Sequence, residues 1–259
     1  MPNIKKKKIL LVGSSGVLGS EYAKFFYDKK SKLIISDIES SKYQRIRKKL
    51  KKVKSLFCDL TSENEIIKMV KDASKIYNGL DSVIINSATT QESLVSKENK
   101  NFPEFEKYPL SLWEKSIKIN LTASFLIARE SIKHLKKTKG SLIFVSSIYG
   151  MVGPDHRIYK GEKFKSIPTY TASKAGLIGL TKWLSTWLGK HSVRVNVVSP
   201  GGIFNNHSKK FKRKYSERTP LNRMGNKNEL NGIMEYLVSD DSSYATGQNF
   251  IIDGGYTSW

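Results

Sequence analysis

Short apolar runs alternate along the chain with longer segments that have helical periodicity. Seven such runs are candidate strands: Ile9 to Val12, Leu33 to Ser36, Val53 to Cys58, Val83 to Ile85, Leu142 to Val145, Val193 to Val198 and Phe250 to Ile252. Helices are expected at Gly16–Tyr27, Lys42–Leu50, Ser62–Tyr77, Leu112–Leu135, Tyr170–Leu188 and Asn228–Val238. Continuous apolar strands that alternate with helices are typical of a parallel sheet buried on both faces. We therefore predict a doubly wound α/β fold with a mostly parallel seven-stranded sheet and helices on both faces.

Helix starts and long polar connections complete this outline. Ser62-x-x-Glu65 and Ser111-x-x-Glu114 have the pattern of a capping box, which begins a helix. Residues 89–111, 148–169 and 201–227 are too long and polar for tight connections, and all three follow strands. Ligands of open α/β sheets bind at this carboxyl edge. Without an internal repeat or a linker, we predict one domain over residues 1–259 with three substrate-loop insertions.

Composition narrows the class of protein. The 259 residues are 39% hydrophobic, which excludes a disordered or low-complexity chain, and the single cysteine, Cys58, excludes an intrachain disulfide. No apolar stretch approaches the roughly 18 residues that a membrane helix needs, so we expect a soluble cytoplasmic protein without a membrane partner. The net charge is +22, but it comes mostly from dispersed lysines, so a nucleic-acid partner is not expected. The densest basic run, Lys209 to Arg223, is either a solvated loop or a segment that binds an anionic substrate.

A glycine turn follows the first strand. Gly13-Ser14-Ser15-Gly16-Val17-Leu18-Gly19 precedes a helical stretch, and such a turn lets a pyrophosphate approach a helix N-terminus. An ordinary strand-to-helix turn is the alternative. Asp37 ends the second strand, 18 residues after Gly19, where a carboxylate accepts hydrogen bonds from an adenosine ribose. Because that carboxylate would repel a 2′-phosphate, the sequence favours NAD over NADP.

With further motifs in order along the chain, the sequence resembles the short-chain dehydrogenase/reductase family over nearly its full length. Beyond the glycine turn, the motifs are Asp59 in Cys58-Asp59-Leu60, Asn86-Ser87-Ala88, Asn120, Ser146-Ser147, Tyr170-x-x-x-Lys174, Pro200-Gly201 and Asp253-Gly254-Gly255. The resemblance implies a Rossmann-type NAD(P)-binding domain. It also implies that Asp59 contacts the adenine, Asn86 helps hold the ribose side, and Ile203 lies near the nicotinamide amide.

The expected cofactor-binding residues follow from the turn, the strand ends and this resemblance. They are Gly13, Ser15, Gly16, Val17, Leu18, Gly19, Asp37, Ile38, Asp59, Leu60, Asn86, Ser87, Ala88, Tyr170, Lys174, Pro200, Gly201 and Ile203. Three departures from the family pattern concern the fine geometry at the cofactor. The turn is Gly-x-x-Gly-x-x-Gly where members of this length usually read Gly-x-x-x-Gly-x-Gly, Thr89 replaces a glycine, and Asn205 replaces a threonine.

Alcohol oxidation needs a group that accepts the hydroxyl proton, and an ordinary tyrosine with a pKa of about 10 is a poor base. Tyr170 and Lys174 are four residues apart on an expected helix, so they share a face, and the lysine charge should lower the pKa of the tyrosine. The resemblance implies that Tyr170 is the general acid/base and that Lys174 also binds the nicotinamide ribose. It further implies that Ser147 orients the substrate oxygen and that Asn120 supports a relay water.

A second tyrosine has the same spacing. Tyr159 and Lys163 are also four residues apart, and Tyr159 lies twelve residues after Ser147, nearer the family's usual separation. Gly161 and Pro168 make a helix there improbable, whereas the stretch after Tyr170 has helical periodicity. We therefore predict Tyr170 as the catalytic residue and an insertion of about ten residues before it. Ser147 is preferred to Ser146 because Ile148-Tyr149-Gly150 fits the family register.

The insertion, together with Ser199-Pro200-Gly201-Gly202-Ile203, also resembles flagellin-modification oxidoreductases that act in making nonulosonic surface sugars. This resemblance implies a secondary alcohol or ketone on a sugar phosphate or nucleotide-sugar as substrate. The alternatives are reduction of another carbonyl substrate such as a 3-oxoacyl thioester, a non-catalytic NAD-binding regulatory or polyanion-binding protein, and retained-NAD epimerase or dehydratase chemistry.

Two further expectations concern metals and assembly. His134, His191 and His207 have no neighbouring ligands at metal-site spacing, so no metal is predicted. The resemblance implies a homo-oligomer, usually a tetramer, formed through the helices at 112–135 and 170–188. Trp183 and Trp187 are expected in the core or between subunits.

Overall fold

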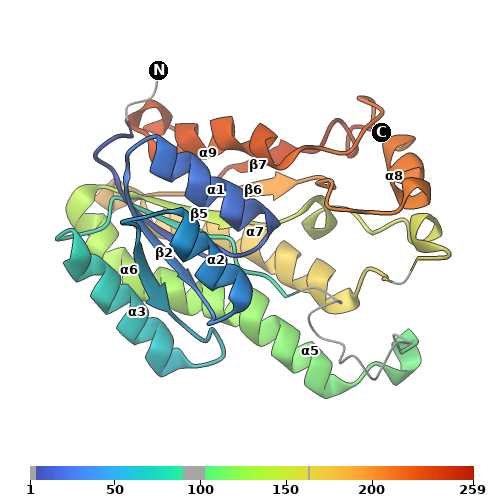
Figure 1. Ribbon diagram of the computed structural model, residues 1–259, viewed down its shortest axis with the longest axis horizontal. Helices are drawn as coiled ribbons and strands as arrows, with labels where there is room; N and C mark the ends of the chain where they lie inside the picture. Colours follow the sequence, from blue (N-terminus) through green and yellow to red (C-terminus); the bar gives the residue numbers. More distant parts are fainter. Residues whose placement is uncertain (1–3, 90–102, 163) are drawn as a thin grey trace.

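A seven-stranded sheet with the strand order β3-β2-β1-β4-β5-β6-β7 forms the centre of the computed structural model, which describes residues 4–89, 103–162 and 164–259 (Figure 1). Every neighbouring pair of strands is parallel. The strands are β1 (Lys8–Val12), β2 (Lys32–Asp37), β3 (Lys54–Phe57), β4 (Ser82–Ile85), β5 (Ser141–Val145), β6 (Arg194–Pro200) and β7 (Asn249–Ile252). The predicted seven-stranded parallel sheet is confirmed.

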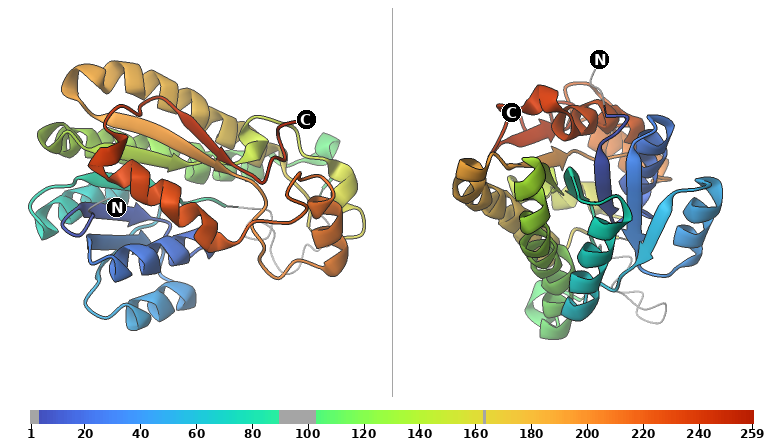
Figure 2. Two further views of the ribbon diagram at one scale, coloured as in Figure 1. Left: turned by 90° about the horizontal axis from the view of Figure 1, so that it is seen from above. Right: turned by 90° about the vertical axis from the view of Figure 1, so that its left-hand side faces the viewer.

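Helices cover both faces of this sheet, as Figure 2 shows. They are α1 (Val17–Asp28), α2 (Ser41–Lys49), α3 (Glu63–Ile76), α5 (Leu110–Ile117), α6 (Ala123–Thr138), α7 (Pro168–Leu188), α8 (Lys209–Ser216) and α9 (Asn231–Val238). One hydrophobic cluster joins α3, α6 and α7 to the sheet, and a second joins α1, α2 and α9 to the opposite face. The doubly wound fold that the sequence predicted is therefore confirmed.

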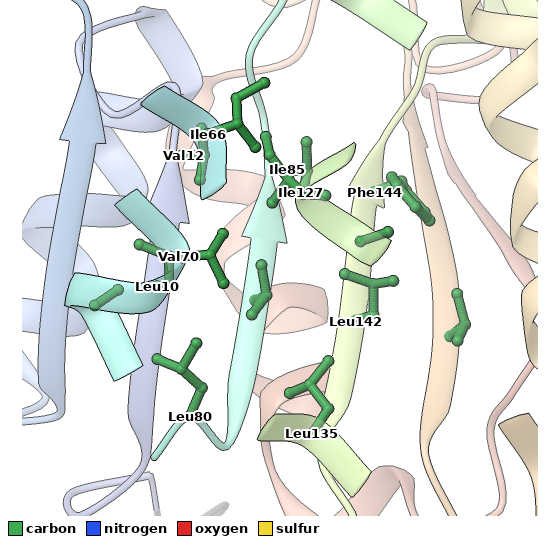
Figure 3. Close-up of a cluster of buried hydrophobic side chains, with 14 of the residues drawn as sticks. Leu10, Val12, Ile66, Val70, Leu80, Ile85, Ile127, Leu135, Leu142 and Phe144 are labelled. Carbon is green, nitrogen blue, oxygen red and sulfur yellow. The ribbon is translucent and has the colours of Figure 1, made fainter. Parts of the chain in front are cut away.

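The central strands are apolar because both their faces are buried. In β5 all five residues are buried, and β1 has four buried residues in a row. Figure 3 shows how Ile66 and Val70 of α3 and Ile127 of α6 lie over strand residues such as Ile85. Because the strands are parallel, the carboxyl ends of β1, β4, β5 and β6 lie along one edge of the sheet. The strand order changes direction between β1 and β4, and ligands of such sheets bind at this point.

The two predicted capping boxes have different outcomes. Ser62 caps α3 by accepting a hydrogen bond from the Glu65 amide, but the Glu65 carboxylate accepts from the Asp59 amide instead of from Ser62. The box predicted at Ser111 is wrong. The α5 helix already begins at Leu110, because the carbonyl of Pro109 accepts the amides of Leu112 and Trp113 and so places Ser111 inside the first turn.

Two helical features differ from the predicted ranges. The helix expected at 112–135 is a longer run in which a π-helical turn, Lys118–Thr122, joins α5 to α6. The α8 helix lies inside the stretch 201–227, which was predicted as a polar loop. Its signal was Ser208, which caps the helix, followed by Phe211 and Tyr215 at a spacing of four residues, both buried. Over the described residues, no helix is long and apolar enough to span a bilayer.

Candidate active site

The glycine turn between β1 and α1 is packed tightly at both of its ends. Gly13 has φ +81°, and a Cβ there would lie 2.5 Å from the amide nitrogen of Ser87. A Cβ on Gly19 would lie 2.0 Å from the carbonyl oxygen of Gly13. Beside Gly16, in contrast, the nearest atom is that same oxygen at 4.0 Å. Glycine is therefore required where the turn meets β4 and α1, while the middle of the turn is open.

This open middle suits a pyrophosphate. Gly16 caps α1 without a side-chain hydrogen bond, and both Gly16 and Val17 are exposed. The amides of the first helical turn therefore face outward at the positive end of the helix, with Leu18 in the same turn. An exposed helix N-terminus after a tight glycine turn is a site for phosphate oxygens, so the residues here fit a dinucleotide.

Asp37, at the end of β2, is tied to this turn. One carboxylate oxygen accepts a hydrogen bond from the Ser15 amide at 2.7 Å, and the other accepts from the Ile38 amide at 2.8 Å. A carboxylate oxygen accepts more than one hydrogen bond, so both oxygens keep capacity for a ribose diol. The side chain of Ile38 is 55% exposed beside them. The carboxylate predicted to hold the ribose thus also sets the shape of the phosphate turn.

The ends of β3 and β4 bring the next predicted residues to the same edge. Asp59 accepts hydrogen bonds from the amide and hydroxyl of Thr61 and precedes Leu60. Asn86 donates from its side chain to the carbonyl oxygen of Gly13 at 2.9 Å, so it supports the glycine turn directly. Ser87 follows, with a buried hydroxyl that has no hydrogen-bond partner among the described residues, and Ala88 continues the segment. The buried hydroxyl of Ser87 is a polar group that a bound ligand could satisfy.

Asn120 lies in the π-helical turn and is fully buried. Its side-chain oxygen accepts from the Thr89 amide at 2.7 Å, and its nitrogen donates to the Thr89 carbonyl and to the Ser173 hydroxyl, both at 3.2 Å. π-helical turns widen a helix by one residue and occur often at functional sites. The Asn120 side chain therefore joins the segment after β4 to α7, close to the predicted acid/base.

Ser147, Tyr170 and Lys174 come together where the segment after β5 packs against α7. The Ser147 hydroxyl lies near enough to the Tyr170 phenol to lower its pKa. The Lys174 ammonium lies 5.5 Å from the centre of the Tyr170 ring and donates to the carbonyl oxygen of Val145 at 2.7 Å. Ser146 points elsewhere, because its hydroxyl donates to the carbonyl oxygen of Lys174. Of the two serines, Ser147 is the one beside the phenol.

The protonation states of this group follow from burial. Burial raises the pKa of Tyr170, and the nearby Ser147 hydroxyl lowers it by less, so the net shift is upward. The lysine charge that the sequence suggested would lower this pKa does not outweigh the desolvation of the phenol. Burial lowers the pKa of the Lys174 ammonium to about 8. A buried ammonium with one carbonyl partner among the described residues fits a site where ribose hydroxyls supply further acceptors.

The predicted nicotinamide side lies after β6. The Gly201 amide donates to the carbonyl oxygen of Ile252 at 2.9 Å, and a Cβ on Gly201 would lie 2.7 Å from the Cα of Asp253. Pro200 ends β6, and Ile203 forms a backbone bridge with Gly225. These residues lie at the same carboxyl edge of the sheet as the glycine turn.

The alternative tyrosine is not on a comparable helix. Tyr159 ends a short 3-10 helix, His156–Tyr159, and Lys163 lies outside the described residues. Tyr170, in contrast, is in the first turn of the 21-residue α7 helix, which begins at Pro168. This geometry supports the choice of Tyr170 over Tyr159.

The basic run from Lys209 to Arg223 is folded and includes the α8 helix. Lys214 donates to the carbonyl oxygens of Arg157 at 3.0 Å and Lys160 at 3.4 Å, and Arg218 pairs with Asp155 at 2.6 Å. Arg223 holds both carboxylate oxygens of Glu229. We call the insertion at 151–162 together with residues 208–218, which include α8, the substrate-side lobe (Figure 1, yellow and orange). The run is thus partly helical rather than a loop throughout, and its binding of an anionic substrate stays a prediction.

Metal ligands do not gather at this edge. Across residues 4–89, 103–162 and 164–259, no three His, Cys, Asp or Glu side chains are grouped as a metal site. Burial lowers the pKa of His134, and Cys58 is a buried thiol whose pKa burial raises to about 12. The arrangement is thus one of a phenol, a hydroxyl and an ammonium beside a dinucleotide site.

Comparisons with known proteins show the family to which the chain belongs. The family model that matches residues 13–257 is described as enoyl-(acyl carrier protein) reductase. A solved short-chain dehydrogenase from Leptospira borgpetersenii serovar Hardjo-bovis, with bound NAD+, is 30% identical with a TM-score of 0.84, covering 98% of this chain and 94% of that chain. The chain belongs to the short-chain dehydrogenase/reductase family.

Other relatives of this short-chain dehydrogenase/reductase are named for different substrates. It is 31% identical over 262 residues to the 3-oxoacyl-[acyl-carrier-protein] reductase of Rickettsia conorii, covering 98% of both chains. It is 28% identical over 268 residues to (+)-borneol dehydrogenase 1 of Salvia officinalis, covering 98% of this chain and 95% of the relative. These relatives show an oxidoreductase and do not support the predicted nucleotide-sugar role or the likeness to flagellin-modification enzymes.

Proposed function

We propose that this short-chain dehydrogenase/reductase interconverts a ketone and a secondary alcohol, with a 3-oxoacyl thioester as the leading substrate class. The observation that supports this best is that the Lys174 ammonium lies 5.5 Å from the centre of the Tyr170 ring, with the Ser147 hydroxyl near the same phenol. A proton donor, an orienting hydroxyl and a cation thus lie together at the edge that carries the glycine turn. This set matches what carbonyl reduction requires.

The proposed roles of the protein groups follow from this geometry. A nicotinamide dinucleotide, when bound, supplies the hydride that reaches the carbonyl carbon. Ser147 orients the carbonyl oxygen, and Tyr170 transfers its phenolic proton to that oxygen, leaving a tyrosinate. The Lys174 ammonium stabilises the tyrosinate, and the buried surroundings strengthen that interaction. Alcohol oxidation uses the same groups in reverse.

Two observations favour a thioester substrate over a sugar substrate. The described relatives include a 3-oxoacyl-[acyl-carrier-protein] reductase at 31% identity. In addition, the surroundings of Tyr170 are mainly apolar and aromatic, since it packs against a cluster of Ile148, Tyr149, Ile158, Phe211, Tyr215, Met224 and Tyr256. Several cations that could have held a sugar phosphate are paired within the protein, as Lys214, Arg218 and Arg223 are.

The direct test is a substrate panel with NADH and with NADPH, followed by the absorbance of the reduced nicotinamide. We expect acetoacetyl-CoA to be reduced, and UDP-, GDP- and CMP-linked sugars to give no comparable rate. Turnover of a nucleotide-sugar alone would overturn the substrate assignment, and activity without net cofactor consumption would favour the retained-cofactor alternative. No turnover of any carbonyl compound would overturn the proposed function.

Cofactor choice provides a separate prediction. We propose NAD(H), because Asp37 places a negative charge at the expected ribose and would repel a 2′-phosphate. Asp37→Asn keeps an acceptor for a backbone amide but removes the charge, so the ratio of kcat/KM for NADPH to that for NADH should rise about tenfold. Steady-state kinetics with both cofactors measures this ratio. If the wild type already prefers NADPH, the role given to Asp37 is wrong.

The pKa of Lys174 predicts how reduction depends on pH. Because burial lowers that pKa to about 8, the ammonium is present below this pH and lost above it. Tyr170 keeps its proton there, since its pKa is raised. The rate of ketone reduction should therefore fall as the pH rises through about 8. Lys174→Met should have a low rate of reduction that does not fall further as the pH rises through about 8. A wild-type rate that stays constant across this pH would contradict the role given to Lys174.

Assembly and location stay predictions. Trp183 and Trp187 stack at 5.5 Å on the outer face of α7 and are 58% and 55% exposed, so they do not lie in the core of the chain. We propose that this face is covered in a homo-oligomer, as the family resemblance implies, and that the protein acts in the cytoplasm.

A further inference from the structure

Tyr159, the tyrosine with the alternative spacing, lies beside the catalytic group although it is not on the catalytic helix. It ends the 3-10 helix His156–Tyr159 in the substrate-side lobe. Tyr159 and Tyr170 both pack against the aromatic cluster around Tyr149 and Phe211. The insertion therefore brings a second phenol to the side of the site where the substrate must lie.

The hydroxyl of Tyr159 forms a pair with a more deeply buried phenol. Its oxygen lies 2.9 Å from the hydroxyl oxygen of Tyr149, whose residue is 8% exposed. Two hydroxyls bring two protons, and only one proton can lie between the oxygens. If Tyr159 donated, the inner proton of Tyr149 would be buried with no acceptor among the residues that the structure describes, which is unfavourable. Tyr149 is therefore the donor, and the proton of Tyr159 is available to another acceptor.

The ring of Tyr159 is held in place by aromatic neighbours. Phe164 meets it edge to face at 5.7 Å between ring centres, and Phe211 lies at 5.5 Å. The lobe that carries Tyr159 is also fixed to α8, since Lys214 donates to the carbonyl oxygens of Arg157 and Lys160. A hydroxyl on a ring with this support is preorganised for hydrogen bonding.

The pair also connects to the reacting group. The Tyr149 amide donates to the Ser147 hydroxyl at 3.2 Å, and that hydroxyl lies near the Tyr170 phenol, whose pKa it lowers. Burial raises the pKa of Tyr159 to about 12, the hydrogen bond with Tyr149 lowers it, and nearby Tyr256 and Tyr170 raise it. Tyr159 is thus a protonated donor at neutral pH, close to the phenol that protonates the carbonyl.

We propose that the Tyr159 hydroxyl positions the substrate by donating a hydrogen bond to a second oxygen, separate from the carbonyl oxygen that Tyr170 protonates. This inference rests on the proposed function and sharpens its substrate class to carbonyl compounds with an additional acceptor oxygen near the reacting carbon. A 3-oxoacyl thioester has such an oxygen in its thioester carbonyl, and a keto-sugar has one in a neighbouring hydroxyl.

The test compares two ketones that differ in the second oxygen. Ethyl 3-oxobutanoate carries ester oxygens, and heptan-2-one has the same chain length without them. For Tyr159→Phe we expect kcat/KM to fall about tenfold with ethyl 3-oxobutanoate and to change by less than about twofold with heptan-2-one. Acetoacetyl-CoA and the nucleotide-sugar panel are tested in the same way. The compound whose rate falls in Tyr159→Phe shows whether the second oxygen belongs to a thioester or to a sugar.

Tyr149→Phe is the matched control, because it removes one hydroxyl and the same hydrogen bond but keeps the outer proton of Tyr159. We expect it to lower the melting temperature as much as Tyr159→Phe does, without changing the discrimination between the ketones. The positioning role would be overturned if Tyr159→Phe lowered kcat/KM equally for both ketones. It would also be overturned if Tyr149→Phe lowered kcat/KM for ethyl 3-oxobutanoate alone, as Tyr159→Phe is expected to do. Wild-type protein that reduces neither ketone, nor acetoacetyl-CoA, nor any nucleotide-sugar of the panel would overturn the proposed function itself.

Discussion

Tyr170→Phe is expected to lower kcat for ketone reduction by about 10³-fold, which lies within the usual contribution of a positioned acid/base. The variant keeps the ring that packs against the aromatic cluster but loses the proton that the carbonyl oxygen must receive. Burial raises the pKa of this phenol, so the proton is present over the whole neutral range. The measurement is steady-state oxidation of NADH with acetoacetyl-CoA, together with NADH affinity from fluorescence titration.

NADH affinity is the internal control for this variant. Ser147 and Lys174 remain in place, and Lys174 still donates to the carbonyl oxygen of Val145. Affinity for NADH should therefore stay within about twofold of the wild type, because the loss is confined to the transition state. Tyr149→Phe removes a buried phenol two residues from Ser147 and should keep most of the rate. A Tyr170→Phe variant with wild-type kcat would show that another group supplies the proton.

Gly19→Ala is expected to disrupt both the fold and the dinucleotide site. Its Cβ would lie 2.0 Å from the carbonyl oxygen of Gly13 and 2.9 Å from the side-chain nitrogen of Asn86, which bonds to that same oxygen. Because backbone atoms on both sides must move, we expect the free energy of unfolding to fall by about 3 kcal/mol and NADH affinity to fall more than tenfold. Urea denaturation and fluorescence titration measure the two effects.

The neighbouring glycine offers a matched comparison. Gly16 has φ −70° and its nearest atom beyond its neighbours is 4.0 Å from an added Cβ, so Gly16→Ala requires no movement. Its unfolding free energy should stay within about 0.5 kcal/mol of the wild type. Equal stability of the two variants would show that the turn relaxes around Gly19.

The strands and the order of the site residues could be predicted from the sequence, whereas two local features could not. Buried parallel strands such as β5 leave a continuous apolar signal, and the glycine turn marks the first strand end. The π-helical turn at Asn120 leaves no such signal, because one extra residue per turn does not change the composition of a helix. The α8 helix was missed because six of its eight residues are polar, five of them Lys or Arg, and only Phe211 and Tyr215 give an apolar signal.

The Tyr170 protonation state shows a further limit. Residue spacing placed Lys174 near the phenol, and the structure puts the ammonium 5.5 Å from the ring centre. Spacing carries no information on how deeply the pair is buried, and burial determines the direction of the pKa shift here.

The substrate-side lobe has a consequence for how such enzymes diverge. Its bonds run largely within itself, from Lys214 to the carbonyl oxygens of Arg157 and Lys160, from Ser208 to Glu162, and from Arg218 to Asp155. The glycine turn, in contrast, is fixed by β2 and β4 through Asp37 and Asn86. Changes accumulated in the lobe can therefore leave the glycine turn undisturbed, and natural selection or a protein engineer can alter the substrate range there while the dinucleotide half stays the same. The lobe residues that pack against Tyr170 are the exception, because they also support the reacting phenol.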